Sequence, residues 1–348
     1  MSEVVRQALA MVIEGATLGQ DEARAAMGAV MDGEATPAQL AALLVALRMR
    51  GETVDELAGF AGAMRDRALR VEAPAGAIDV VGTGGDRSGT INISTAAALV
   101  VAADGVPVAK HGNRAITSRS GSADVLDALG VRIDHDPASA AVALGEVGFA
   151  FLFAPGFHPA MRHAGPTRRE LGVRTAFNLL GPLTNPAGVR RQVLGVGDAP
   201  TAARLAEVAA RLGTERTLVV HGDGVDELPL DGTGMVHDVG PDGTETYRVD
   251  PAALGLRAAS VADLAGGDPD ENARLLEAVL AGEAGPHRDA VLLNAAAGFV
   301  AAGTVEDLAA GVERARSAID AGAPVRLLER LRAERRRAEA ARPAGGAT

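Results

Sequence analysis

Residues 82–90 form a glycine-rich segment whose composition suits the binding of phosphate. The sequence Gly-Thr-Gly-Gly-Asp-Arg-Ser-Gly-Thr follows an apolar stretch and precedes an Ala/Val-rich segment. Glycines permit positive φ angles and a close approach of the backbone to an anion, and a helix start offers unpaired N–H groups. The segment has no Lys-Ser/Thr of a Walker A loop, and Arg87 stands where a dinucleotide fingerprint needs its third glycine. It predicts a different phosphate nest, which Asn92, Ser94 and Thr95 complete; a tight turn with a helix cap is the alternative.

A second polar segment, residues 110–122, also follows an apolar stretch. Lys110 and Arg114 offer positive charge, and Gly112 lets the backbone pass close to a ligand. Further donors are Asn113, Thr117, Ser118, Ser120 and Ser122. Taken alone, such a segment is equally consistent with an ordinary loop. Two nests close together predict a ligand with phosphates at both ends.

Asp226 and Glu227 are adjacent acids in a predicted loop after an apolar strand. Magnesium in proteins usually takes one or two carboxylates together with phosphate oxygens and waters. The pair therefore suits Mg²⁺ bound between protein and diphosphate. A solvated acidic turn is the alternative.

A third polar region contains His158, His163 and the arginines 168, 169 and 174. The two histidines are five residues apart, whereas a zinc-binding helix places them four apart, so the spacing disfavours zinc. Arginines here suit either the binding of a substrate carboxylate or the fixing of helix ends.

The elements that would position these residues alternate between strand and helix from residue 78 onwards. Apolar stretches predict strands at 78–81, 106–109, 131–133, 149–153, 193–196, 217–221, 235–239 and 246–249. Such alternation is typical of an α/β fold with a mostly parallel sheet flanked by helices. Parallel strands bring their carboxyl ends to one edge, where both loops would lie.

Helices are predicted on both sides of this alternating region. Residues 1–70 contain several amphipathic helices, two of them with the capping boxes that begin at Thr36 and Thr53. A short linker at 71–77 separates this small helical domain from the rest. Residues 252–330 are again mostly helical, and the arginine-rich end is expected to be a charged helix that frays into a solvated tail.

Composition excludes several classes of protein. The 348 residues carry a net charge of −11, with seven Phe, one Tyr and no Trp, which disfavours nucleic-acid binding by counterion release or base stacking. Cysteine is absent, so disulfides, Cys–zinc sites and thiol nucleophiles are excluded. No signal peptide or apolar stretch of about 20 residues is present, which predicts a cytoplasmic protein without membrane association.

Together the motifs resemble those of the anthranilate phosphoribosyltransferase family. The resemblance is carried by six short segments, at residues 82–86, 92–95, 110–114, 120–126, 168–172 and 178–183. It extends from the N-terminal helices to about residue 321. Thr117 stands where the family commonly has Ser, and Thr167 and Ala176 replace bulkier apolar residues.

The resemblance implies a fold and an assembly. A small helical domain would comprise residues 1–72 with a returning segment at 170–190. A large α/β domain would comprise residues 73–169 and 191–345. Two copies would form a homodimer through the helical domain.

The resemblance also implies a reaction and its residues. The 5-phosphoribosyl group would pass from 5-phosphoribosyl 1-diphosphate to the amine of anthranilate, releasing diphosphate, as a step of tryptophan biosynthesis with two Mg²⁺ per subunit. The implied metal ligands are Ser94, Asp226 and Glu227, and Gly82, Asn113 and Arg168 would contact anthranilate. The implied donor-binding residues are Gly82, Gly85, Asp86, Thr90, Asn92, Ile93, Ser94, Thr95, Lys110, His111, Gly112, Asn113, Arg114, Ala115, Ile116, Thr117, Ser118 and Ser122.

Two other functions fit this type of fold. A pyrimidine nucleoside phosphorylase would use phosphate instead of diphosphate, and the acid pair and the Arg168 segment speak against it. A non-catalytic relative that binds nucleic acid would have a basic groove and eroded glycine loops. The negative net charge and the intact loops disfavour that alternative.

Overall fold

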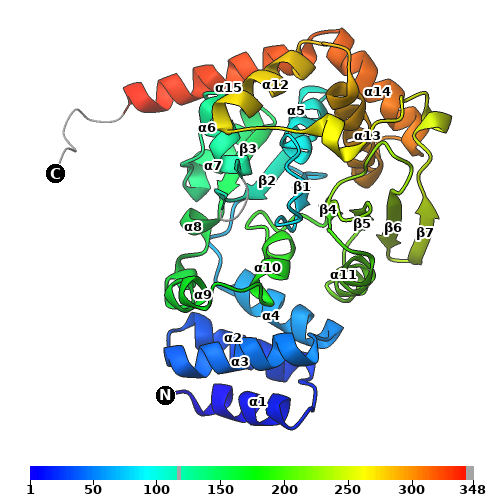
Figure 1. The fold of residues 1–348 in the computed structure, drawn as a ribbon. Coiled ribbons are helices and arrows are strands. Elements are labelled where there is room, and N and C mark those ends of the chain that lie inside the picture. The colour runs from blue at the N-terminus through cyan, green and yellow to red at the C-terminus, as the bar shows by residue number, and fades with distance from the viewer. Residues whose placement is uncertain (116–118, 342–348) are drawn as a thin grey trace.

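Four helices at the N-terminus pack on one another below the rest of the molecule. The computed structural model describes residues 1–115 and 119–341. The helices are α1 (Glu3–Ile13), α2 (Gln20–Met31), α3 (Pro37–Arg50) and α4 (Val54–Asp66), drawn in blue in Figure 1. Both predicted capping boxes are present: the Thr36 hydroxyl accepts from Gln39 N, and the Thr53 hydroxyl from Glu56 N, each at 3.2 Å. Such caps satisfy backbone donors that a helix start leaves unpaired.

A seven-stranded sheet forms the centre of the α/β part, within the described residues. The strands are β1 (Ile78–Gly82), β2 (Val108–Gly112), β3 (Phe149–Phe153), β4 (Arg191–Gly195), β5 (Arg216–His221), β6 (Met235–Gly240) and β7 (Gly243–Arg248). Their order is β3-β2-β1-β4-β5-β6-β7. The first five in this order are parallel, and β6 and β7 add antiparallel pairs at one edge. The predicted mostly parallel sheet is therefore confirmed.

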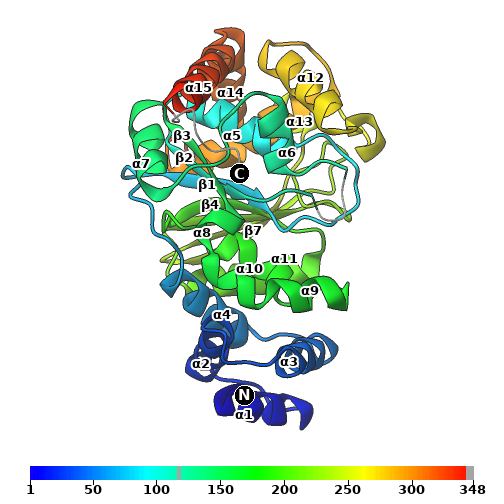
Figure 2. The same ribbon diagram turned by 90° about the vertical axis from the view of Figure 1, so that its left-hand side faces the viewer.

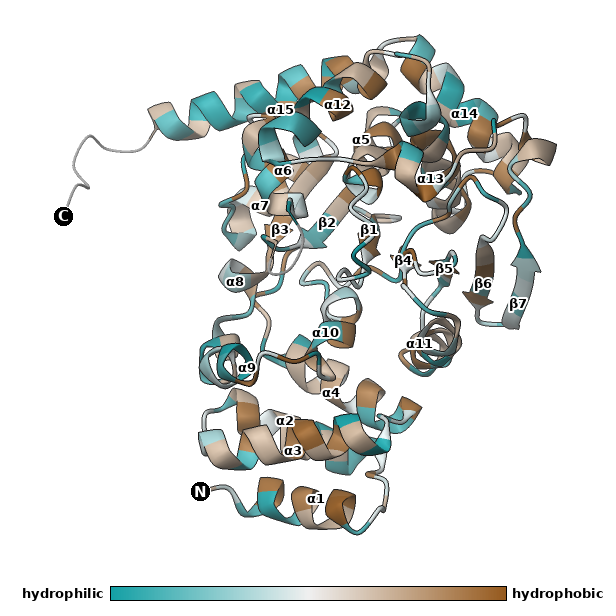
Figure 3. Cartoon of the chain, in the orientation of Figure 1, coloured by the Kyte–Doolittle hydropathy of each residue, from teal (hydrophilic) through white to brown (hydrophobic). Residues whose placement is uncertain are grey.

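Helices cover both faces of this sheet. One face carries α5 (Ile93–Ala103), α6 (Ser122–Ala128), α12 (Pro269–Leu280), α13 (Pro286–Ala302), α14 (Leu308–Asp320) and α15 (Ala323–Ala340). α11 (Ala199–Arg211) lies on the other face, between the sheet and the N-terminal helices (Figures 1 and 2). Figure 3 shows apolar colour gathered in α5 and α13 and polar colour along α15. The large core lies between the sheet and the buried helices α5 and α13.

The segment after β3 returns to the N-terminal helices. It contains α8 (Ala154–Phe157), η1 (Pro159–His163), α9 (Gly165–Leu171), α10 (Phe177–Leu180) and η2 (Gly181–Leu183), whereas α7 (Pro137–Glu146) precedes β3. Phe177, Leu180 and Leu183 are buried in one apolar cluster with side chains of α2, α3 and α4. Arg65 Nε donates to the Leu183 carbonyl at 2.6 Å. Within the described residues, no helix is long and apolar enough to cross a membrane.

Residues 131–133 do not form the predicted strand. Gly130 has a φ of 76° and follows α6, and Val131 N closes back onto Leu126 O at 2.9 Å. This closure is typical of a helix C-terminus and uses the backbone group that a strand would need. The next residue, Asp134, forms an isolated bridge with Leu152 of β3.

The arginine-rich end is not merely a solvated tail. Arg332 Nε donates to Leu129 O at 2.8 Å, and Arg335 Nη1 pairs with Asp127 at 2.9 Å. These bonds attach α15 to the end of α6, which periodicity alone does not reveal. Residues 342–348 lie outside the described part of the chain.

Candidate active site

The two glycine-containing loops start at the carboxyl ends of neighbouring parallel strands. One follows β1 at Gly82 and the other follows β2 at Gly112. They are joined at Asn92: its amide donates to Ser120 O at 3.2 Å, and its Oδ1 accepts from the Ser120 hydroxyl at 3.3 Å. The predicted convergence of the two loops is therefore confirmed.

The acid pair lies between the first loop and the start of α5. Asp226 Oδ2 accepts from Gly84 N at 2.7 Å, and Glu227 Oε1 accepts from Ser94 N at 3.0 Å. Asp86 is close as well, because Asp226 N donates to its Oδ2 at 3.4 Å. Carboxylates more than a hundred residues away in the chain thus take up N–H groups of both the glycine loop and the helix terminus.

Burial and mutual repulsion raise the pKa of both acids. For Asp226 the larger cause is burial and the next is the negative charge of Asp86; for Glu227 they are burial and the charge of Asp226. A divalent cation would relieve this repulsion. Within the described part of the chain, no group of three or more His, Asp or Glu side chains is arranged to hold a metal by itself. The pair therefore fits Mg²⁺, which shares its coordination with phosphate and water.

Lys110 lies beneath the loops, not on their surface. The side chain is 1% exposed, and its ammonium donates to Val80 O. Burial lowers the pKa of Lys110, while the charges of Asp79, Glu227 and Asp226 raise it. The predicted contact of Lys110 with phosphate stays a prediction, and the structure adds that its charge faces the acids from the sheet side.

The second loop is tied to α6 by charged contacts. Arg114 pairs with Asp124 at 2.8 Å and with Asp127 at 3.2 Å. Asp124 also accepts from Ala115 N at 2.9 Å and from Gly121 N at 3.0 Å. The Ser122 hydroxyl donates to Asn113 O at 3.3 Å. The predicted donor-binding residues Ile116, Thr117 and Ser118 lie outside the described residues.

Other residues predicted to bind the phosphoribosyl donor lie in the first loop or at the start of α5. Gly85 has a φ of 72°, and Thr90, at the end of the loop, forms a single bridge with Ala265. Ile93, Ser94 and Thr95 form the first turn of α5, where Ile93 and Thr95 are buried and Ser94 is half-buried.

Arg168 lies on α9, on the side of the N-terminal helices. Its guanidinium is 4.8 Å from the ring centre of Phe177, and burial lowers its pKa. It makes no hydrogen bond or ion pair with the described residues through its side chain. The predicted shared contact of Gly82, Asn113 and Arg168 with anthranilate stays a prediction.

Two histidines face one another between the sheet and the returning segment. The ring centres of His111 and His158 are 5.1 Å apart, and His111 Nδ1 is 3.0 Å from Gly181 O. Burial lowers the pKa of His111 to about 3 and that of His158 to about 4. Both rings are therefore neutral near pH 7.

Two residues of this region were missed by the sequence analysis. Asp79 is fully buried; its carboxylate accepts from His111 N at 3.2 Å and from the Asn185 amide at 2.8 Å. Asn185 also donates to Ala109 O at 2.8 Å. An aspartate inside an apolar strand was the available signal, whereas Asn185 becomes recognisable only through the fold.

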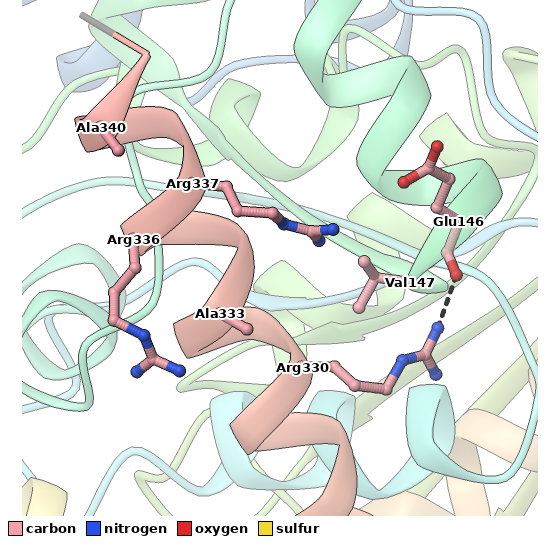
Figure 4. A pocket seen from close by; sticks show the side chains of 7 residues that line it. All are labelled: Glu146, Val147, Arg330, Ala333, Arg336, Arg337 and Ala340. Carbon is pink, nitrogen blue, oxygen red and sulfur yellow. Dashed lines mark hydrogen bonds between the residues drawn. The ribbon is translucent and has the colours of Figure 1, made fainter.

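A separate groove of about 670 Å³ lies between the end of α7 and α15 (Figure 4). It is lined by Glu146, Val147, Arg330, Ala333, Arg336, Arg337 and Ala340. None of the predicted site residues lines it, and it is therefore not the candidate active site.

Comparison with known proteins assigns the family. The α/β domain of a glycosyl transferase family matches residues 75–325, and the helical bundle domain of a glycosyl transferase family matches residues 6–68. Anthranilate phosphoribosyltransferase of Xanthobacter autotrophicus is 52% identical over 93% of this chain and 94% of its own. That of Thermomicrobium roseum is 54% identical over 94% of this chain and 96% of its own. The chain belongs to the anthranilate phosphoribosyltransferase family.

Solved structures of this family share the fold. The crystal structure of anthranilate phosphoribosyltransferase from Thermus thermophilus has a TM-score of 0.90 and 50% identity, over 94% of this chain and 99% of the other. The enzyme of Saccharomyces cerevisiae in complex with PRPP and Mg has a TM-score of 0.87 and 27% identity, over 97% and 99%. The chain is therefore a glycosyl-transferring enzyme with a small helical domain and a large α/β domain.

Proposed function

We propose that the loops and the acid pair form the active site of an anthranilate phosphoribosyltransferase. The chain transfers the 5-phosphoribosyl group of 5-phosphoribosyl 1-diphosphate to the amine of anthranilate, a step of tryptophan biosynthesis. The observation that carries the assignment is the position of Asp226 and Glu227, at 2.7 and 3.0 Å from N–H groups of the glycine loop and of α5. A diphosphate with its metal ions needs this combination of backbone donors and carboxylates.

Magnesium binding is part of this proposal, with two ions per subunit. Asp226 and Glu227 would hold these ions with the Ser94 hydroxyl. Burial, and after it the charge of a neighbouring carboxylate, raises the pKa of both acids, and a divalent cation would offset that negative charge. A structure of the yeast enzyme contains PRPP and Mg. When bound, the metal would neutralise charge on the departing diphosphate.

Other residues of the two loops, together with Arg168, would bind and orient the two substrates. The loop residues 82–95 and 110–122 would hold the donor through backbone N–H groups, hydroxyls and Lys110. Arg168 would hold the anthranilate carboxylate, and Gly82 and Asn113 would lie beside its ring. A structure of the yeast enzyme contains 4-fluoroanthranilate.

The transfer itself requires little acid–base chemistry. Cleavage of the bond between ribose C1 and diphosphate leaves an electron-poor ribose, and negative charge develops on the departing oxygen. Aligned N–H donors of the loop stabilise this charge more in the transition state than in the ground state. The neutral amine of anthranilate is already nucleophilic, so its position opposite the diphosphate is the main requirement.

The proposal extends to domains, assembly and location. Residues 1–72 with about 170–190 would form the helical domain, and residues 73–169 with 191–345 the α/β domain. The apolar cluster shared by the N-terminal helices and the returning segment supports their grouping, although the cluster also extends to α11 and the sheet. Exposed apolar side chains on α1 and α3, Ile13 at 66% and Met49 at 83%, support a homodimer through this domain. We expect the enzyme in the cytoplasm.

Consumption of anthranilate, followed by its fluorescence, tests the proposed function. We expect consumption only when 5-phosphoribosyl 1-diphosphate and Mg²⁺ are both present, and none after chelation of the metal. Phosphorolysis of thymidine or uridine without any consumption of anthranilate would favour the nucleoside phosphorylase alternative and contradict the proposal.

A further inference from the structure

Arg174 reaches from the connection between α9 and α10 to the glycine loop of β1. Its Nη1 donates to Gly84 O at 2.7 Å, over 90 positions of sequence. The short connection is fixed at both ends: Gly172 ends α9 with a φ of 63°, and Thr175 N donates to Asn178 Oδ1 at 2.9 Å. Arg174 is therefore held in place by its own segment, which lies between the sheet and the N-terminal helices (Figure 1).

The glycine loop approaches this guanidinium closely at Gly85. A Cβ atom at Gly85 would lie 2.0 Å from Arg174 Nη1, and Gly85 has a φ of 72°. On its other side, Gly84 donates its N–H to Asp226 at 2.7 Å. One glycine thus links the acid pair to Arg174, and the guanidinium lies at the loop that would hold the diphosphate.

The charge of Arg174 is not neutralised by a neighbour. Arg174 is exposed and has no ion pair with any residue in the described ranges 1–115 and 119–341. In contrast, Arg114 of the second loop has two aspartate partners. An unpaired guanidinium beside backbone N–H groups is a strong site for a phosphate, which it can bind through two parallel hydrogen bonds.

We propose that Arg174 is a binding residue for the diphosphate group of the phosphoribosyl donor. The inference rests on the proposed function and adds to it a cation that comes from the returning segment. Diphosphate is a better candidate than the anthranilate carboxylate as the group that Arg174 binds, because the Arg174 guanidinium contacts the glycine loop. Arg168 has no hydrogen bond to this loop, and its guanidinium lies 4.8 Å from the ring centre of Phe177. Because the returning segment packs on the N-terminal helices, this contact also joins the two domains across the donor.

Titration of the protein with inorganic diphosphate and Mg²⁺ in a calorimeter tests the inference without any acceptor. Arg174→Gln is expected to weaken diphosphate binding by about tenfold or more, since hydrogen bonds to charged groups are the strong ones. Arg174→Lys keeps the charge and should recover part of the affinity. Arg169→Gln removes an exposed charge that has no ion pair within residues 1–115 and 119–341, and the variant should bind diphosphate like the unaltered protein.

Steady-state kinetics separates this role from a structural one. In Arg174→Gln the KM for 5-phosphoribosyl 1-diphosphate should rise by a similar factor, while the KM for anthranilate and the melting temperature stay unchanged. Diphosphate affinity equal to that of the unaltered protein, or an equal loss in Arg169→Gln, would overturn the inference. If the unaltered protein binds diphosphate through Arg174 but consumes no anthranilate, the proposed function is wrong and the inference about Arg174 stands.

Discussion

Two glycines explain how the acid pair comes so close to the strand ends. A Cβ atom at Gly82 would lie 2.5 Å from Asp226 Oδ2, and one at Gly195 would lie 1.8 Å from the Asp226 carbonyl oxygen. Both glycines end neighbouring strands, β1 and β4, which pair in register. Any side chain at either position would push the acidic loop away from the glycine loop. At the scale of single residues, the site therefore depends on missing side chains as much as on charged ones.

Gly195→Ala should lower turnover by about 100-fold, because a displacement of about 1 Å at a reacting group can have an effect of that size. Anthranilate fluorescence gives the rate. Gly145→Ala is the matched control: no atom lies within 4 Å of its added Cβ. That change, on helix α7, should leave turnover unaltered and stabilise the protein by up to about 1 kcal/mol. Normal turnover in Gly195→Ala would show that the position of Asp226 is unimportant.

Arg168→Ala should raise the KM for anthranilate by about tenfold, because one charged hydrogen bond to the carboxylate would be lost. The KM for the phosphoribosyl donor should not change. Arg169→Ala, one residue further on the same helix, provides the control. An unchanged KM for anthranilate would remove Arg168 from the acceptor site.

At the scale of elements, the returning segment and strand β2 meet through buried polar groups. Asn185 links the Asp79 carboxylate of β1 to the Ala109 carbonyl of β2, at 2.8 Å each. His111 at the end of β2 stacks obliquely on His158, which ends α8. Buried polar groups with defined partners fix the relative position of the elements that carry them.

The two histidines give the protein a measurable pH dependence. Their pKa values of about 3 and about 4 in the folded state lie below the ordinary value of 6.5. At a pH between these values and 6.5, the unfolded state therefore binds more protons than the folded state. The contribution of the two neutral rings to the free energy of unfolding is therefore complete above pH 6.5. It declines as the pH falls towards the folded-state pKa values, by about 1.4 kcal/mol per pH unit for each ring. Urea unfolding at several pH values measures this decline.

His158→Gln should reduce the slope of the free energy of unfolding against pH by the contribution of one ring, about 1.4 kcal/mol per pH unit. Asp79 does not affect the comparison. Burial raises its pKa to about 6, so its contribution to the free energy of unfolding increases as the pH falls, and this contribution is the same in the variant and in the unaltered protein. His163→Gln, at an exposed position, is the control. The same slope in His158→Gln and in the unaltered protein would contradict the neutral, buried state of His158.

At the scale of the whole molecule, the helical domain presents apolar side chains that the described residues of the chain leave exposed. Val4, Ile13, Val45 and Met49 on α1 and α3 are 41%, 66%, 37% and 83% exposed. Where exposed apolar side chains form one patch, they are typical of a surface that another protein molecule covers, and we propose this role for these four. A homodimer would place this surface at its centre, with the two active sites outside it.

Met49→Asp should weaken the proposed dimer by at least about tenfold, because a buried charge without a partner is costly. Analytical ultracentrifugation across a concentration series measures the effect. Val142→Asp replaces a side chain that is 57% exposed on α7, outside the helical domain, and should leave the association unchanged. A protein that is monomeric at all concentrations, or a Met49→Asp variant that associates normally, would refute this interface.

The sequence by itself determined the parts of the site whose signal is local. Glycine density at 82–90, the polar stretch at 110–122 and the acid pair are visible because each depends on neighbouring residues. The capping boxes at Thr36 and Thr53 and most strands follow from local spacing in the same way. The resemblance to a family then supplied the returning segment.

Only the tertiary structure decided which residues far apart in the chain meet at the site. Asp79 with Asn185, Gly195 with Asp226 and Arg174 with Gly84 are contacts between residues 31 to 106 positions apart. Residues 131–133 do not form a strand because the end of α6 uses the backbone N–H of Val131, the first of them, for its own closure. Local patterns fix which backbone groups need partners, but packing of the whole chain selects the partner.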